Sequence, residues 1–154
     1  MLISRDHSLL LVIDIQEKLA PAINHGEVAI KNNQRLLEAA RLLALPSFIS
    51  EQYVKGLGPS IAAIKNVAVD AIYFEKIYFS CTRQPGVLET LKAKGRQQII
   101  VTGMETHVCV LQTALGLRGA GFDVFLVADA TASRSAESRS IAIERMRDAG
   151  VHIV

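Results

Sequence analysis

Near its start the chain reads Leu9-Leu10-Leu11-Val12-Ile13-Asp14, a continuous apolar run that ends in a carboxylate. A run of this kind is typical of a β-strand that is buried on both faces, because helices cover both sides of a parallel sheet. In such sheets ligands bind outside the carboxyl ends of the strands, near the point where the strand order reverses. We therefore expect a central parallel strand over residues 9–13, with Asp14 at the ligand-binding edge.

The rest of the chain repeats this pattern in alternation with helical patterns. Further apolar runs lie at residues 47–50, 71–74, 98–102, 124–127 and 151–154. Apolar residues with helical spacing lie at residues 31–45, 87–91, 110–117 and 141–149. Gly95, Gly121 and Gly150 each follow a helical stretch, where a left-handed residue commonly ends a helix. Strands that alternate with helices form parallel βαβ units, so we predict an α/β fold: a doubly wound, mainly parallel six-stranded sheet with helices on both faces, Rossmann-like in architecture.

Length and composition indicate one globular domain over residues 1–154. The chain is 50% hydrophobic and 21% charged, with 10 Gly and 4 Pro, which excludes a disordered, collagenous or low-complexity chain. Its formal net charge is only +2, no run of five like charges occurs, and aromatic residues make up 5% with no Trp. These features do not support nucleic-acid binding.

Location and assembly can be predicted from the same sequence. No stretch reaches the roughly 18 apolar residues of a membrane span, and no basic and apolar leader precedes the first strand. The chain's two cysteines do not make a disulfide framework, so we expect a cytoplasmic protein without a membrane partner. The sequence stops at the run that ends in Val154, so we expect either a partly bare sheet edge or a natural continuation. Helix faces that carry Val110, Leu111 and Leu117 lead us to expect a homo-oligomer.

Motif searches exclude several classes of site. The chain has no G-x-x-x-x-G-K-[ST] or G-x-G-x-x-G phosphate loop and no G-x-S-x-G nucleophile elbow. Its histidines are scattered, with no H-x-H, H-E-x-x-H or C-x-x-C motif. We therefore expect no cofactor and no dedicated metal site.

The strand predicted at residues 98–102 leads into a segment that is suited to carry a nucleophile, Gly103-Met104-Glu105-Thr106-His107-Val108-Cys109. Thr106 can cap a helix that begins at about His107, which places Cys109 in the first turn. The helix macrodipole and unpaired N–H groups favour a thiolate there, so we predict a pKa of Cys109 below the free value of about 8.5. The alternative for Cys109 is a small buried hydrophobic side chain, the usual state of a free cysteine.

Asp14 and Lys76 are further candidates, each with an alternative. Asp14 either takes part in chemistry, caps a neighbouring helix or pairs with a surface lysine. Lys76 follows the strand predicted at residues 71–74 and is either part of a site or a solvated loop lysine. None of the three residues decides the function alone.

Taken together, the candidate segments resemble the isochorismatase-like cysteine hydrolases in order, spacing and strand context. The resemblance covers essentially the whole chain. Its main segments are Ile13-Asp14-Ile15-Gln16, Lys76 followed by Phe79-Ser80, and Gly103-Met104-Glu105-Thr106-His107-Val108-Cys109-Val110. Further matches to the branch called isochorismatase domain-containing proteins are Glu51-Gln52-Tyr53 with Gly56-Leu57-Gly58-Pro59, Gln112-Thr113-Ala114, and Asp129-Ala130 with Ser133-Arg134.

The resemblance implies roles for individual residues. It implies a catalytic triad of Asp14 as general base, Lys76 as fixed cation and Cys109 as nucleophile. It also implies an oxyanion site made by the backbone N–H groups of Glu105 and Cys109, and a cis peptide bond between Met104 and Glu105. Thr106 and Gln16 are expected to contact the substrate.

Departures from two better-understood branches narrow the expected activity. Nicotinamidases carry an Asp-x-His metal motif where this chain reads Ser50-Glu51-Gln52-Tyr53, so nicotinamide is a weak candidate substrate. Isochorismatases that cleave a vinyl ether lack the nucleophilic cysteine. Cys109 therefore favours the branches that use covalent catalysis.

Three functional interpretations stay open from the sequence. The first is a hydrolase that cleaves a C–N bond of a small amide-like molecule through a Cys109 thioester. The alternative is a catalytically idle binding or assembly protein with the same fold, because fold does not imply function. A thiol-redox protein that uses Cys81 is the third, and the absence of a C-x-x-C motif disfavours it.

Overall fold

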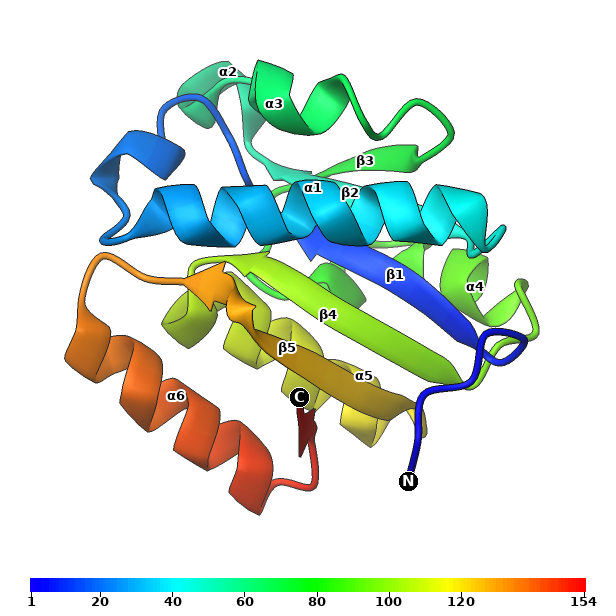
Figure 1. Cartoon of the computed structure of the whole chain (residues 1–154). Helices are drawn as coiled ribbons and strands as arrows, with labels where there is room; N and C mark the ends of the chain where they lie inside the picture. Colours follow the sequence, from blue (N-terminus) through cyan, green and yellow to red (C-terminus); the bar gives the residue numbers. More distant parts are fainter.

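Six parallel strands form one sheet in the computed structural model, which describes residues 1–154. The strands are β1 (Ser8–Ile13), β2 (Ser47–Gln52), β3 (Ile72–Lys76), β4 (Gln98–Met104), β5 (Asp123–Ala132) and β6 (His152–Ile153). Their order in the sheet is β3-β2-β1-β4-β5-β6, so the winding direction reverses between β1 and β4 (Figure 1). The predicted doubly wound six-stranded sheet is confirmed, and every strand pair is parallel.

Helices cover both faces of the sheet. On one face lie α1 (Gly26–Leu42) and the short α3 (Ala62–Lys65), and Figure 1 shows α1 running across the sheet. On the other face lie α4 (Val87–Lys92), α5 (Leu111–Gly119) and α6 (Ala136–Asp148). The sequence patterns did not predict α3 or the equally short α2 (Val54–Leu57), because four residues are too few to show a helical period. No helix combines the length and the apolar character needed to cross a membrane.

The apolar run of β1 is continuous because its alternate residues enter two separate cores. Leu9, Leu11 and Ile13 belong to the cluster on the α5 side, and Leu10 and Val12 belong to the cluster on the α1 side. Successive side chains of a strand point to opposite faces, so a strand covered on both sides must be apolar throughout.

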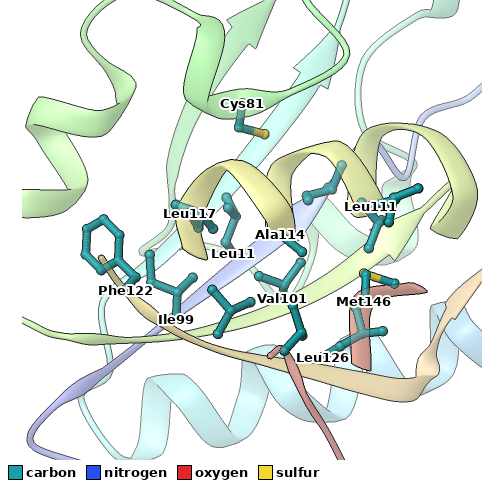
Figure 2. Packing of buried hydrophobic residues seen from close by; sticks show 14 of the residues in the cluster. Leu11, Cys81, Ile99, Val101, Leu111, Ala114, Leu117, Phe122, Leu126 and Met146 are labelled. Atoms are coloured by element: carbon teal, nitrogen blue, oxygen red, sulfur yellow. The ribbon is translucent and has the colours of Figure 1, made fainter. Parts of the chain in front are cut away.

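The larger core also contains the apolar face of α5. Figure 2 shows Leu111 and Leu117 of this helix beside strand residues such as Leu11 and Val101. Leu111 is 8% exposed, whereas Val110 and Leu117 have no exposed surface. These side chains are packed against the sheet, so they do not provide the free apolar face from which we expected a homo-oligomer.

Gly103 of β4 lies opposite Ile13 of β1 in the strand register. Its φ is +112°, a conformation that side-chain-bearing residues rarely adopt, and a Cβ atom there would overlap with the backbone of Ile13. Only glycine fits at this position without displacing one of the strands. The close approach brings the end of β1 beside the segment that follows β4.

We expect Gly103→Ala to destabilise the domain by more than about 2 kcal/mol, because it combines backbone strain with steric overlap. Gly119→Ala is the matched control, since that glycine ends α5 with ordinary helical backbone and open space around its Cβ position. The control should change the free energy of unfolding by less than about 1 kcal/mol. Urea unfolding followed by circular dichroism measures both, and equal midpoints for the two variants would contradict this interpretation of the β1–β4 contact.

Candidate active site

Asp14 and Lys76 form an ion pair at the carboxyl ends of β1 and β3. Lys76 Nζ donates to Asp14 Oδ2 over 2.7 Å, and neither side chain has any exposed surface. The second carboxylate oxygen, Oδ1, accepts a hydrogen bond of 2.7 Å from Ser50 Oγ on β2. Because β2 lies between β1 and β3, the ion pair spans the end of the middle strand.

Burial and pairing shift the pKa values of both groups. Burial raises the pKa of Asp14, and the opposing effects of Lys76 and Ser50 do not fully offset it. Burial lowers the pKa of Lys76, but the charge of Asp14 and the nearby thiols outweigh it, so the pKa of Lys76 is raised. Lys76 is therefore a fixed cation at neutral pH, and Asp14 is a stronger base than an exposed aspartate.

Cys109 lies beside this ion pair on a π-helical turn, η3 (Thr106–Val110), which joins β4 to α5. The residue is only 6% exposed, and both Asp14 and Lys76 affect the pKa of its thiol. Burial raises the pKa of the Cys109 thiol, the negative charge of Asp14 raises it further, and Lys76 lowers it only in part. The structure thus brings the three predicted residues Asp14, Lys76 and Cys109 together, with Cys109 as a neutral thiol.

Two predictions about this segment were wrong. Thr106 does not cap an α-helix that begins at His107: Glu105 precedes a π-helical turn, and the α-helix begins only at Leu111. Cys109 therefore does not lie in the first turn of α5, and its pKa is raised rather than lowered because burial beside Asp14 dominates. The Thr106 hydroxyl is buried and has no hydrogen-bond partner.

Glu105, four residues before Cys109, has a backbone N–H without an acceptor. The cis peptide bond expected between Met104 and Glu105 is present. Glu105 is 6% exposed, and its backbone N–H donates to no acceptor in the protein. Buried N–H groups without an acceptor are rare, so this donor is available to a ligand.

The Glu105 carboxylate, unlike its backbone N–H, is already paired, because it binds Arg134. Arg134 Nη2 donates to Glu105 Oε1 over 2.7 Å, and the Arg134 backbone N–H donates to Oε2 over 3.1 Å. Burial alone would raise the pKa of Glu105, but the hydrogen bonds and charge of Arg134 outweigh it and hold the pKa below its usual value. The carboxylate thus ties the segment after β5 to the segment that carries Cys109.

Gln16, which we expected to contact substrate, contacts backbone instead. Its Oε1 accepts from Gln52 N over 2.7 Å, and its Nε2 donates to Gln52 O over 2.9 Å and to Gly58 O over 2.7 Å. The side chain has no exposed surface. Both amide hydrogens are therefore engaged in holding the end of β2.

Cys81, Ser50 and Gln52 belong to the same polar cluster but were not among the predicted site residues. Cys81 starts a 3-10 turn, η2 (Cys81–Arg83), and is fully buried. Burial raises the pKa of Cys81 to about 11, with Asp14 raising it and Lys76 lowering it. The sequence signals for these residues were Gln52 within a family match and Cys81 as one of the two cysteines of the chain, which we weighed only for a thiol-redox function.

A cavity of about 320 Å³ is formed mainly by the loop that follows β3. It is lined by Ile77, Tyr78, Phe79, Ser80, Arg83 and Gln112. Its wall begins at the residue after Lys76, and Gln112 lies three residues beyond Cys109. The side chains at 77–79 are exposed, between buried Lys76 and buried Ser80.

The parallel sheet carries a carboxylate, an ammonium and a thiol at its carboxyl edge, which defines an α/β protein with a candidate site where the strand order reverses. The chain belongs to the isochorismatase family, since residues 8–154 match the family model described as Isochorismatase domain. Isochorismatase domain-containing protein 1 of Danio rerio is 40% identical over 95% of this chain and 51% of its own length. The chain thus spans about half the length of the first curated relatives it matches.

Solved structures share the same fold. The MAR1 ribonuclease of Caenorhabditis elegans has a TM-score of 0.91 and 40% identity, over 97% of this chain and 77% of that chain. YcaC from Pseudomonas aeruginosa, which holds hexane-2,5-diol and covalent acrylamide, has a TM-score of 0.91 and 28% identity. The match covers 99% of this chain and 77% of that chain. YcaC from Escherichia coli, an octameric hydrolase of unknown specificity, has the same TM-score and identity. The match covers 99% of this chain and 76% of that chain.

The raised pKa values of the buried thiols predict a loss of stability at alkaline pH. Between the ordinary thiol pKa of 9.0 and the folded value of about 11 for Cys81, the unfolded chain binds fewer protons than the folded chain. The free energy of unfolding therefore falls as pH rises through this window, by up to about 1.4 kcal/mol per pH unit for one thiol.

Urea unfolding at pH 8, 9, 10 and 11 measures this slope. We expect Cys81→Ala to be less stable than wild type at pH 8, because it leaves a cavity, but to lose less stability between pH 9 and pH 11. Parallel stability curves for the two proteins would show that Cys81 does not hold its proton in the folded state.

Proposed function

We propose that this protein is a cysteine hydrolase that cleaves a C–N bond of a small amide-like molecule through a thioester-type intermediate on Cys109. The observation that carries the proposal is the meeting of the Cys109 thiol, the Asp14–Lys76 ion pair and the unpaired Glu105 N–H at one edge of the sheet. Membership of the isochorismatase family supports hydrolysis. The covalent acrylamide in a YcaC relative supports a reactive nucleophile within the family fold.

In the first step, the Cys109 sulfur attacks the carbonyl carbon of the substrate while Asp14 takes the thiol proton. A base is required because the raised pKa of Cys109 keeps the thiol protonated at neutral pH. The raised pKa of Asp14 suits it to this task, since general base catalysis is most efficient with a pKa nearer the working pH. Lys76 stabilises the negative charge that develops on sulfur.

The tetrahedral intermediate places negative charge on the former carbonyl oxygen. The buried Glu105 N–H is the donor that we assign to this oxygen, together with the Cys109 N–H that the family resemblance implies. Loss of one such donor typically lowers the rate by ~100–1000-fold. Collapse of the intermediate breaks the C–N bond, and Asp14 returns its proton to the departing nitrogen.

Hydrolysis of the thioester completes the cycle. Asp14, again a carboxylate, takes a proton from a water molecule as the water oxygen attacks the acyl carbon. The C–S bond then breaks, the acid is released, and the proton returns to the Cys109 sulfur. One carboxylate thus acts as base and acid in both halves of the reaction.

A screen of small amides, carbamoyl compounds and hydroxamates against wild type and Cys109→Ala tests the proposal. A true substrate should be hydrolysed by wild type only, and quenched reactions should contain a peptide with the acyl group on Cys109. Hydrolysis that proceeds equally well in Cys109→Ala, or no turnover of any class, would overturn it.

Substitutions within the triad should act as a unit. Asp14→Asn keeps the shape of the side chain but cannot accept the proton, and Cys109→Ser replaces the thiol by a far weaker acid. We expect each change to lower kcat/KM by at least ~1000-fold, and the double variant to be hardly worse. Circular dichroism confirms folding, and more than about a tenth of wild-type activity in Asp14→Asn would mean that another residue is the base.

We also infer that the protein forms homo-oligomers, as its octameric Escherichia coli relative does. The row of exposed apolar side chains at Ile77, Tyr78 and Phe79 supports association, because such patches are uncommon on monomers. Light scattering at micromolar concentration should give a mass well above the 16.8 kDa of one chain. A mass equal to one chain would contradict the inference.

A further inference from the structure

The Lys76 ammonium has two side-chain acceptors, and the mechanism above uses only one of them. Lys76 Nζ donates to Asp14 Oδ2 and to Gln52 Oε1, each over 2.7 Å. An ammonium group carries three donor hydrogens and accepts none. With two hydrogens committed and no water access to the buried nitrogen, the direction of the third is fixed.

Gln52 is placed beside Lys76 by the strand register. The two residues are direct partners in the β2–β3 pairing, so their side chains lie on the same face of the sheet. Ser50 lies two residues earlier on β2 and therefore shares that face, which is how its hydroxyl reaches Asp14. The end of β2 thus supplies one group to each member of the ion pair.

Further hydrogen bonds hold the Gln52 amide in one orientation. Gln52 Nε2 donates to Ile77 O over 3.1 Å, which leaves Oε1 facing Lys76. The Gln52 backbone is held on both sides by the Gln16 amide, which binds its N–H and its carbonyl. The acceptor for Lys76 is therefore rigid from backbone to side-chain tip.

An amide at this position has a chemical advantage over a carboxylate. It accepts a strong hydrogen bond from the ammonium without neutralising its charge, whereas a second carboxylate would compensate Lys76 and weaken its effect on a nearby thiolate. The charge of Lys76 is coupled to both thiols of the cluster, Cys81 and Cys109. Asp14 and Gln52 thus hold two hydrogens of Lys76, which leaves the third for another neighbouring acceptor.

We propose that Gln52 is a positioning residue, whose amide oxygen holds the Lys76 ammonium with one N–H free for the Cys109 sulfur. This inference deepens the proposed function and rests on it for its catalytic meaning. Gln52 itself does not touch the reacting atoms.

Two substitutions separate the hydrogen bond from the charge, and a third serves as control. Gln52→Met keeps length and neutrality but removes the acceptor, whereas Gln52→Glu keeps an acceptor and adds a negative charge. Gln84→Met is the matched control, because Gln84 Oε1 accepts from Ile77 N over 3.2 Å on the same loop and is not a hydrogen-bond partner of Lys76.

The first measurement is the rate of Cys109 alkylation by iodoacetamide at pH 9, followed by mass spectrometry of the Cys109 peptide. We expect Gln52→Met to slow it by roughly two- to tenfold, the equivalent of one hydrogen bond. Gln52→Glu should slow it at least as much, because the added charge disfavours the thiolate. Gln84→Met should react within about twofold of wild type.

The second measurement is the ¹⁵N NMR signal of the lysine ammonium groups. Lys76 is the only buried lysine, so its signal should be the one protected from exchange with water. Gln52→Met should shift this signal and speed its exchange, and Gln84→Met should leave it unchanged.

A purely structural role for Gln52 predicts a different pattern. Gln52→Met and Gln84→Met would then behave alike, with wild-type alkylation rates and an unaltered Lys76 signal, and that outcome overturns the proposal. Neither measurement depends on substrate turnover. A failed amide screen combined with altered Lys76 and Cys109 would therefore refute the proposed function and leave the positioning of Lys76 by Gln52 established.

Discussion

Two opposite charges, Asp14 and Lys76, lie 2.7 Å apart with no exposed surface, and the rest of the structure has to keep them together. Removing one partner of such a pair typically costs roughly 3–5 kcal/mol, because the other charge stays buried and unpaired. The partners come from β1 and β3, so the pair exists only while β2 lies between those strands in the observed register. Ser50 and Gln52 on β2 then supply the remaining hydrogen bonds. The order of the strands in the sheet thus determines the geometry of the site.

The charge balance of the cluster explains why its thiols are neutral. One carboxylate and one ammonium cancel, and ionisation of either cysteine would add an uncompensated negative charge in a buried place. The pKa values of Cys81 and Cys109 are raised accordingly. A reaction that moves a proton from Cys109 to Asp14 keeps the total charge of the cluster unchanged, which is the least costly way to form a thiolate in a buried site.

Local patterns predicted the parts of the fold that depend on local sequence. The six apolar runs predicted the six strands, and Asp14 was singled out because it ends one of them. Lys76 follows a predicted strand and gained its site role only from the family resemblance. Gln52 could not be placed beside Lys76, because that contact depends on the β2–β3 register, which no short pattern encodes. The π-helical turn was likewise invisible, so the environment of Cys109 was misjudged: its helix-end position suggested a low pKa, and burial beside Asp14 produced a high one.

The loop after β3 assigns its residues to two different tasks. Lys76 and Ser80 point into the protein, and Ile77, Tyr78 and Phe79 between them are exposed and line the neighbouring cavity. These three side chains make none of the hydrogen bonds of the polar cluster, so they are free to vary without disturbing the ion pair. Divergence among descendants of this domain can therefore proceed by exchanging three surface residues, which alters the lining of the cavity and the surface offered to another subunit while the buried ion pair stays the same.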